Sequence, residues 1–493
     1  MIKNIPQIFR NKLIKNPNIN VLGVKNNNIW KWTNGTELNN MINYSIDVLK
    51  DRNVNKGDRV IYKGKNSVEW LAWNLATHSL GAVWVPLYSN QKEEYCRYII
   101  NDCEPKVLIS DDDTKYHNMN FITNKIENIK YNSDYDIFHN DLCTLIYTSG
   151  TTGNPKGVML SHNNIISNIN ALNSRFKDFE NKDFTSLNIL PWAHIYGLTT
   201  ELYYNLFNDN KVAISSGVDN FVKECSEIKP NLLYLVPKVL ELIKKKLSIL
   251  DKPVLRMILP LVLNRLFGGN LFTIFMGGAK LDDNTKKFYL DNGINICEGY
   301  GCSETAPMIS VNHISDPRDI NSIGKVLDNV LVDIVNGEIH VAGPNVMLGY
   351  WNNKEATDEV LVENNSVTWY KTGDSGEKLD DFLYYKGRIS ENYKLTNGKF
   401  VNVNDTESRL KKSISNFFII YGENRSYNIL IVEKPFDENQ LDEINKNIDN
   451  YLKIKKVLSV DSDVFADYLT PKMSIKRKKL IKHVEKEINE IYT

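Results

Sequence analysis

The sequence lacks a net charge and any hydrophobic run long enough to cross a bilayer. Its 60 Lys and Arg residues balance 60 Asp and Glu residues, so no overall field attracts nucleic acid or an anionic membrane. The most apolar stretch, residues 254–266, is too short for a transmembrane helix and contains Arg256, Pro260 and Arg265. It favours a buried or surface-docked helix over a membrane-touching one. An anionic ligand must therefore be bound by local groups.

Patterns typical of disulfide frameworks and metal sites are also missing. The six cysteines are scattered without a CxxC pair, which is typical of reduced thiols in the cytoplasm. No HExxH motif occurs, and no histidine lies at metal-ligand spacing from a cysteine, so no zinc site is predicted. The amino-terminal residues carry positive charge without the apolar segment of a signal peptide. We therefore expect a cytoplasmic protein whose contact with a membrane is at most peripheral.

The order of extended and helical segments indicates an α/β protein. Strand-like RVIYK, AVWVPLY and KVLIS alternate with helix-like segments, and the alternation continues to about residue 320, which predicts doubly wound sheets covered by helices. From Ile323 the sequence pattern changes to short extended segments separated by turn residues, which predicts a β-rich subregion over residues 323–387. Residues 388–493 mix strands with helices expected over Asp437–Leu452 and Ile475–Ile491. We predict a large domain over 1–387 and a small α+β domain over 388–493.

A loop rich in glycine and hydroxyl residues follows one predicted strand. The segment YTSGTTGNPKG spans Tyr147 to Gly157 and differs from the GxxxxGK[ST] motif, because Gly157 follows Lys156. Glycine lets backbone N–H groups turn toward a phosphate, hydroxyl side chains add donors, and Lys156 supplies a cation. The predicted phosphate-binding residues are Thr148, Ser149, Gly150, Thr151, Thr152, Gly153 and Lys156.

This loop resembles the phosphate-binding motif of the adenylate-forming, or AMP-binding, superfamily, which includes acyl-CoA synthetases, peptide-synthetase adenylation domains and luciferases. Further segments match other motifs in the family's order. They are LPWAHIYG (190–197), GGAKL (277–281), EGYGCSET (298–305), GPNVMLGYW (343–351), WYKTGD (369–374), KGRISENYKLTNGKFV (386–401) and TPKMSIKRKK (470–479). The resemblance implies a small carboxy-terminal domain that rotates between two half-reactions, with its hinge near Glu391.

The resemblance also assigns residues to parts of the nucleotide. It implies that Glu304 holds Mg²⁺ with Thr148 nearby, and that Thr148 and Thr305 contact phosphate oxygens. Tyr300 would stack on adenine, with Gly278 and Ala279 on the other side and Glu298, Gly299 and Gly301 in the same binding segment. Asp374 would accept hydrogen bonds from the ribose hydroxyls, Arg388 would support ribose and phosphate, and His194 would lie near the acyl pocket. These positions all match the family's motifs in this sequence.

One position departs from the family's pattern. The carboxy-terminal lysine that reaches the reacting carboxylate corresponds to Ser474, while Lys472 and Lys476 lie two residues to either side. We take Lys476 as the candidate catalytic lysine, although a displaced cation loses much of its effect. The basic run from Lys476 to Lys479 fits equally a solvated helix start or a phosphate or CoA contact.

The segment YKLTNGKF is most like the long-chain fatty acyl-CoA synthetases. The resulting hypothesis is a ligase that uses ATP and Mg²⁺ to activate a fatty acid as acyl-AMP and passes the acyl group to CoA. A ligase with another acceptor, such as a carrier-protein thiol, stays open as an alternative. An impaired nucleotide or acyl-AMP binding protein stays open as well, because of Ser474. Small molecules are the predicted partners, with no nucleic acid, and the sequence identifies no protein partner.

Overall fold

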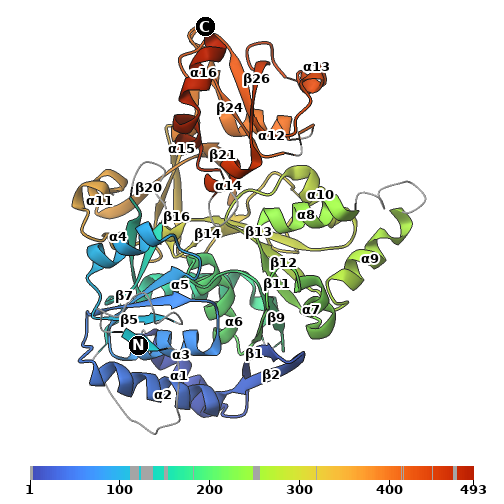
Figure 1. Cartoon of the computed structure of the whole chain (residues 1–493). Helices are drawn as coiled ribbons and strands as arrows, with labels where there is room; N and C mark the ends of the chain where they lie inside the picture. The colour runs from blue at the N-terminus through green and yellow to red at the C-terminus, as the bar shows by residue number, and fades with distance from the viewer. Residues whose placement is uncertain are drawn as a thin grey trace. The chain divides into compact units, whose positions relative to one another are not determined.

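The computed structural model describes most of the chain as two compact units (Figure 1). It describes residues 4–110, 121–123, 137–148, 154–180, 182–247, 256–317, 319–411, 413–414, 416–446, 448–469 and 475–493. The first unit contains Met1–Thr148, Asn154–Val332 and Val341–Tyr370, and the second contains Asp333–His340 and Lys371–Thr493. None of the helices in these ranges is both long and apolar enough to span a bilayer.

One sheet of the first unit is mainly parallel, in the order β18-β8-β7-β4-β3-β5-β6. Its apolar strands, such as the buried VWVPL of β4, are typical of parallel strands covered on both faces. At one end of this order, β8 pairs antiparallel with both β7 and the edge strand β18. The strands are β3 Arg59–Gly64, β4 Val83–Tyr88, β5 Val107–Ser110, β6 Phe121–Thr123, β7 Leu142–Thr148, β8 Lys156–Ser161 and β18 Gly349–Tyr350; the neighbouring helices in the chain are α1 Ile5–Lys15, α2 Gly35–Asp51, α3 Val68–Ser79, α4 Glu93–Cys103, α5 His162–Arg175 and α11 Lys354–Val360.

The other sheet of the first unit runs in the order β15-β14-β13-β12-β11-β9-β10-β1-β2. Its strands are β1 Asn20–Asn26, β2 Ile29–Asn34, β9 Thr185–Asn188, β10 Lys211–Ile214, β11 Leu232–Leu235, β12 Thr273–Met276, β13 Ile296–Gly301, β14 Met308–Val311 and β15 Lys325–Val326. The accompanying helices are the π-helix η2 Tyr196–Tyr203, α6 Tyr204–Phe207, α7 Phe221–Ile228, α8 Pro237–Leu247, α9 Leu259–Leu266 and α10 Asp283–Asp291, with the short 3₁₀ turns η1 Lys177–Phe179, η4 Arg256–Ile258 and η5 Ser303–Thr305.

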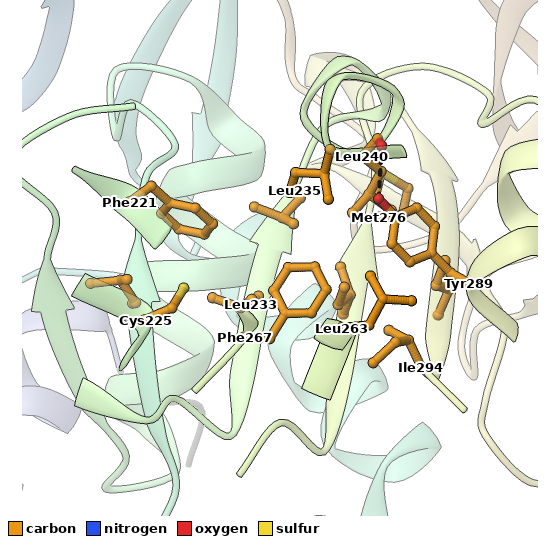
Figure 2. Close-up of a cluster of buried hydrophobic side chains, with 14 of the residues drawn as sticks. Phe221, Cys225, Leu233, Leu235, Leu240, Leu263, Phe267, Met276, Tyr289 and Ile294 are labelled. Atoms are coloured by element: carbon orange, nitrogen blue, oxygen red, sulfur yellow. Dashed lines mark hydrogen bonds between the residues drawn. The ribbon is translucent and has the colours of Figure 1, made fainter. Parts of the chain in front are cut away.

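A large hydrophobic cluster fixes several of these helices on one face of that sheet. Leu233 and Leu235 of β11 point the same way because side chains two residues apart share a face. Figure 2 shows them packed with Leu240 of α8 and Leu263 of α9, and shows the Tyr289 hydroxyl hydrogen-bonded to the Leu240 carbonyl at 2.8 Å. The cluster therefore orders the carboxyl ends of β11 and β12, where GGAKL begins.

The second unit combines a hairpin with a small three-stranded sheet. In the hairpin, β20 Val367–Leu379 pairs antiparallel with β21 Phe382–Arg388, and β16 Leu331–Val335 and β17 Glu338–Ala342 follow in the order β16-β17-β20-β21. Alternate residues of the small sheet enter two different clusters, with Leu430 in one and Ile429 in the other, so both faces are buried. The remaining elements of this unit are η6 Ile389–Glu391, β22 Tyr393–Lys394, β23 Phe400–Val401, α12 Val403–Leu410, β24 Phe418–Tyr421, β25 Asn428–Glu433, η7 Glu438–Gln440, α13 Leu441–Ile444, β26 Ile454–Val460, α14 Ser462–Asp467, α15 Arg477–His483 and α16 Glu485–Tyr492, whereas the short strand β19 Leu361–Asn364 belongs to the first unit.

The predicted α/β class is confirmed, whereas two predicted helices are shorter than expected. The helix predicted over Asp437–Leu452 is limited to η7 and α13. It ends at Asn445, whose side chain exchanges two hydrogen bonds with the backbone of Ile454 in β26. The helix predicted over Ile475–Ile491 divides into α15 and α16. The compact units divide the chain near residue 370, so the predicted boundary at residue 388 stays a proposal about where the mobile domain begins.

Two buried histidines in the first unit predict a marked loss of stability at acid pH. Burial lowers the pKa of His78 to about 3, and burial, with the charges of His78 and Lys56, holds the pKa of His162 well below 6.5. Below pH 6.5 the unfolded chain therefore gains protons that the folded chain does not accept, and folding weakens as the pH falls from 6.5 toward 3. We expect the free energy of unfolding to be about 2 to 3 kcal/mol lower at pH 5.5 than at pH 7.5 from this pair. Urea unfolding at both pH values measures this difference in the free energy of unfolding.

The variant His78→Gln is the control. It should remove about half of the pH dependence of the free energy of unfolding, and an unchanged pH dependence would contradict the role of His78.

Candidate active site

The two ends of the phosphate-binding loop are held by paired strands. Thr148 is the last residue of β7, Lys156 is the first of β8, and the antiparallel register places them directly opposite each other. The Thr148 hydroxyl lies 3.5 Å from the carbonyl oxygen of Lys156. The predicted phosphate-binding residues Ser149, Gly150, Thr151, Thr152 and Gly153 lie outside the described residues. Their roles stay predictions, but both anchors of the loop are fixed by the sheet.

Tyr350, which the sequence-based site did not include, connects Lys156 with Glu304. The Lys156 ammonium lies 4.8 Å from the centre of the Tyr350 ring, and the Tyr350 hydroxyl donates a hydrogen bond of 2.8 Å to Oε1 of Glu304. Burial and the Glu304 carboxylate raise the pKa of Tyr350, so its hydroxyl stays protonated and can donate. Pairing of β18 with β8 places Tyr350 opposite Val158, close to Lys156 at the start of β8. The tyrosine that precedes the final tryptophan of the GPNVMLGYW motif was the signal that could have identified it.

Glu304 also has the chemistry that a magnesium site needs. Mg²⁺ is usually bound by one or two carboxylates together with substrate phosphates and waters. Within the described ranges the only side-chain partner of the Glu304 carboxylate is the Tyr350 hydroxyl on Oε1, which leaves Oε2 for a cation. The Thr148 hydroxyl is a second oxygen donor. The described part of the chain contains no group of three or more His, Cys, Asp or Glu residues that could hold a metal ion. The residues present therefore fit Mg²⁺ bound with a nucleotide.

Thr305 is buried and hydrogen-bonded within its own turn. Its side chain is fully buried, and its hydroxyl donates to the carbonyl oxygen of Pro307 at 2.5 Å. The backbone around it is tied to the GPNVMLGYW segment, because Met347 donates to the carbonyl of Glu304 and the Asn345 amide donates to that of Thr305. In this structure Thr305 stabilises the turn that carries Glu304, and its contact with a phosphate stays a prediction.

The predicted adenine-binding segments lie at the carboxyl ends of neighbouring parallel strands. β12 and β13 pair in parallel, and Gly278 and Ala279 follow β12 while Gly299, Tyr300 and Gly301 end β13. Such strand ends form the usual ligand-binding edge of an α/β sheet. Gly278 has φ +85°, which favours glycine, and both Gly278 and Ala279 are exposed. The placement agrees with the predicted site, although it does not test stacking of adenine on Tyr300.

Glu298 has a different surrounding from that expected of a nucleotide contact. Its carboxylate is buried, with Oε2 lying 2.9 Å from the Lys286 ammonium and Oε1 accepting a hydrogen bond from the backbone N–H of Leu281. Lys286 also donates to Asn312 and to the carbonyl oxygen of Ser322. The Glu298 side chain thus joins α10 to β13 inside the protein, and Lys286 is a residue that the sequence-based analysis missed.

His194 is held by the start of a π-helix. Its Nδ1 accepts a hydrogen bond of 3.1 Å from the backbone N–H of Tyr196, which leaves the ring proton on Nε2. The Tyr196 hydroxyl donates to the carbonyl oxygen of Phe275, and a Cβ on Gly277 would lie only 3.0 Å from the Tyr196 ring. π-helical turns are frequent at functional sites. Tyr196 therefore connects His194 to the GGAKL segment, although the structure does not test an acyl pocket there.

In the second unit, the predicted ribose ligand is paired with the predicted ribose- and phosphate-supporting arginine. Asp374 of β20 lies directly opposite Arg388 of β21, and Nε of Arg388 lies 2.9 Å from Oδ1 of Asp374. Arg388 also donates to the carbonyl oxygen of Thr372, whose hydroxyl accepts from the Asp374 N–H. Burial, reinforced by Asp374, raises the pKa of Tyr385 nearby. The hairpin thus orients a buried carboxylate toward a fixed guanidinium.

The residues of the predicted hinge and carboxy-terminal motif are only partly described. Oε2 of Glu391 lies 4.0 Å from Nε of Arg477, and Arg477 also pairs with Glu407 and donates to the Ile420 carbonyl oxygen. One member of the basic run therefore stabilises the second unit. The Lys476 N–H donates to the Tyr468 carbonyl oxygen at 2.7 Å. Lys472 and Ser474 lie outside the described residues, so the catalytic role of Lys476 and the hinge at Glu391 stay predictions.

Together, the sheets and the loop anchored at their edge define a nucleotide-binding α/β protein with a carboxylate suited to magnesium. The chain belongs to the AMP-binding enzyme family, whose profile matches residues 12–351. The predicted membership of the adenylate-forming superfamily is therefore confirmed.

Curated relatives support the same assignment, and a solved structure shows the same fold. The long-chain-fatty-acid–CoA ligase FadD15 of Mycobacterium bovis is 27% identical over 453 residues, covering 77% of this chain and 74% of that protein. Long chain acyl-CoA synthetase 3 of Arabidopsis thaliana is 24% identical and covers 98% of this chain and 91% of that protein. ATP-bound MatB from Rhodopseudomonas palustris shares the fold with a TM-score of 0.83 at 22% identity, covering all of both chains. The predicted likeness to long-chain acyl-CoA synthetases is thus confirmed.

Proposed function

We propose that this protein is an ATP-dependent acid–thiol ligase that converts a long-chain fatty acid into its CoA thioester. The observation that carries the proposal is the linked arrangement of Lys156, Tyr350 and Glu304 beside the phosphate-binding loop. This arrangement places a cation and a carboxylate at one site, as required for an enzyme that brings a carboxylate onto a phosphate. The long-chain relatives favour a fatty acid as the substrate.

The chemistry has two steps. A carboxylate oxygen of the acid attacks the α-phosphorus of ATP, and the bond to pyrophosphate breaks, which gives acyl-AMP. The CoA thiolate then attacks the acyl carbonyl, and AMP leaves. Both reactants of the first step are anions, so positive charge near the phosphates lowers the barrier. Bound Mg²⁺ would supply part of this charge by neutralising phosphate oxygens.

Each site residue of this chain has a proposed role in these two steps. Lys156 would offset negative charge on the phosphates, Glu304 would hold the metal, and Tyr350 would keep the Glu304 carboxylate oriented. Asp374 would accept hydrogen bonds from the ribose hydroxyls, with its carboxylate oriented by Arg388. His194 would contact the carboxylate of the acid. We further propose a cytoplasmic enzyme that reaches membranes only peripherally, since long-chain fatty acids partition into bilayers.

Pyrophosphate release tests the proposal. Purified protein is incubated with ATP, Mg²⁺ and acids from short to long chain, each with and without CoA, and the acyl product is identified by mass spectrometry. Release that requires a long-chain acid, together with acyl-CoA formed only when CoA is present, is expected. Acyl-AMP that accumulates regardless of CoA would instead indicate another acceptor, and ATP binding without any release would indicate an impaired binding protein.

The alternative of an impaired binding protein arises from Ser474. If a missing cation at this position limits adenylation, Ser474→Lys should raise the rate of pyrophosphate release about tenfold or more, because a correctly placed charge can act on the reacting groups. Ser474→Met is the matched control, since it adds a side chain of similar length without charge. An increase for neither variant, or the same increase for both, would show that the charge at position 474 does not limit the reaction.

A further inference from the structure

Helix α9 and the preceding turn η4 carry more apolar side chains than the fold buries. Leu259 and Leu263, one helical turn apart, are fully buried in the cluster of Figure 2. Leu261 lies between them in sequence and therefore faces the opposite side of the helix, where it is 70% exposed. Met257 and Ile258 of η4 are 85% and 44% exposed. A helix that is apolar on both faces needs a second apolar surrounding besides the core.

This part of the chain is also positively charged, although the whole chain has no net charge. Basic residues outnumber acidic ones in the described residues of α8, η4 and α9. The basic residues include Lys238, Lys244, Lys245, Lys246 and Arg265, and the single acidic residue in these elements is Glu241. Three of the lysines occupy the last turn of α8, and Arg265 occupies the last turn of α9. Leu240 of α8 and Leu263 of α9 join the same cluster, so both helices cover the same face of the sheet. In Figure 1, α9 lies at the outer edge of this unit.

We propose that the η4–α9 surface, formed by Met257, Ile258, Leu261 and Arg265, docks on an anionic lipid bilayer. Exposed apolar side chains beside basic residues are the features that bind a helix to a membrane interface, where the apolar groups insert and the cations contact anionic headgroups. A second copy of the chain fits this surface less well, because it would bring like charges together. The biological purpose rests on the proposed function, since docking would bring the enzyme to fatty acid dissolved in the bilayer.

Vesicle binding tests the inference on the full-length protein. Sedimentation is measured with vesicles of phosphatidylcholine alone and with vesicles containing about one third phosphatidylglycerol. We expect tighter binding to the anionic vesicles, weakening as salt is raised. The triple variant Met257→Ser, Ile258→Ser and Leu261→Ser should bind at least about 100-fold more weakly, because three apolar side chains no longer insert. Arg265→Gln should weaken binding about fivefold on anionic vesicles alone.

A matched triple variant distinguishes vesicle binding by the η4–α9 surface from non-specific binding by any exposed apolar side chains. Ile14, Ile29 and Val218 are similarly exposed but lie on other elements, so their replacement by serine should leave vesicle binding unchanged. The circular dichroism spectrum and the urea unfolding midpoint should be the same in all variants, which shows that each variant is folded and keeps this test independent of the proposed activity. Wild-type protein that does not bind vesicles, or equal binding by the two triple variants, would overturn the proposal. A dimer in solution that only the first triple variant disrupts would assign the surface to a second copy.

Discussion

Replacing Glu304 by glutamine is expected to lower the rate of pyrophosphate release about 100- to 1000-fold. The substitution keeps the shape of the side chain and the hydrogen bond from Tyr350, which an amide oxygen can accept. It removes the negative charge that would hold Mg²⁺ beside the phosphates. The Mg²⁺ concentration that gives half-maximal activity should rise as well, since a neutral amide is a weaker ligand for this ion. Initial rates measured across a magnesium titration report both effects.

Two further variants make that result specific. Tyr350→Phe keeps the ring against which Lys156 lies but removes the hydroxyl bound to Glu304, and it should lower the rate about tenfold, the usual worth of a hydrogen bond to a charged group. Glu355→Gln, the control, removes an exposed carboxylate in α11, five residues after Tyr350 in the sequence, and should leave the rate of pyrophosphate release unchanged. Equal losses for Glu304→Gln and Glu355→Gln, or full activity of Glu304→Gln, would exclude the proposed role of Glu304.

Replacing Lys286 by methionine is expected to lower the free energy of unfolding by about 3 to 5 kcal/mol. The Lys286 ammonium and the Glu298 carboxylate are buried, with 3% and 1% of their side chains exposed. Removing the cation leaves a buried carboxylate with the Leu281 N–H as its remaining partner in the described chain. Uncompensated buried charge is among the most costly changes that a single mutation can make. Urea unfolding followed by circular dichroism measures the loss.

The neighbouring lysine on the same helix provides the control. Lys287 pairs with Asp291 at 2.7 Å but is largely exposed, so Lys287→Met should cost less than about 1 kcal/mol. Adding Glu298→Leu to Lys286→Met removes the unpaired charge and should recover much of the stability. Equal costs for Lys286→Met and Lys287→Met would show that the buried pair is not structurally important. Such a result would reopen a role for the Glu298 carboxylate in binding the nucleotide.

The order and spacing of short motifs were enough to predict the family and the general architecture. Motifs such as YTSGTTGNPKG and EGYGCSET combine glycines, hydroxyls and charged residues at strand ends, and strand ends can be recognised from apolar runs in the sequence. For the same reason β3, β4 and β5 lie where the strand-like segments RVIYK, AVWVPLY and KVLIS predict them. Local backbone chemistry of this kind depends only on residues close together in the chain.

The functions of individual side chains depended on partners far away in sequence. Glu298 and Glu304 lie in one motif, yet one carboxylate is buried against Lys286 of α10 and the other is reached by Tyr350, 46 residues further along. The basic run likewise includes Arg477, whose partner Glu407 precedes it by 70 residues. No periodicity encodes such pairs, because they arise from helix packing and from strand order in the sheets.

The sequence by itself therefore determined the α/β class, the AMP-binding family and the segments that form the site. Only the tertiary structure decided which acidic residues stabilise the fold and which is available to a metal ion. It also decided which side of α9 is covered, because leucine residues occur on two opposite sides of this helix in the sequence. Burial is a property of the packed chain, and it separates groups whose local sequences look alike.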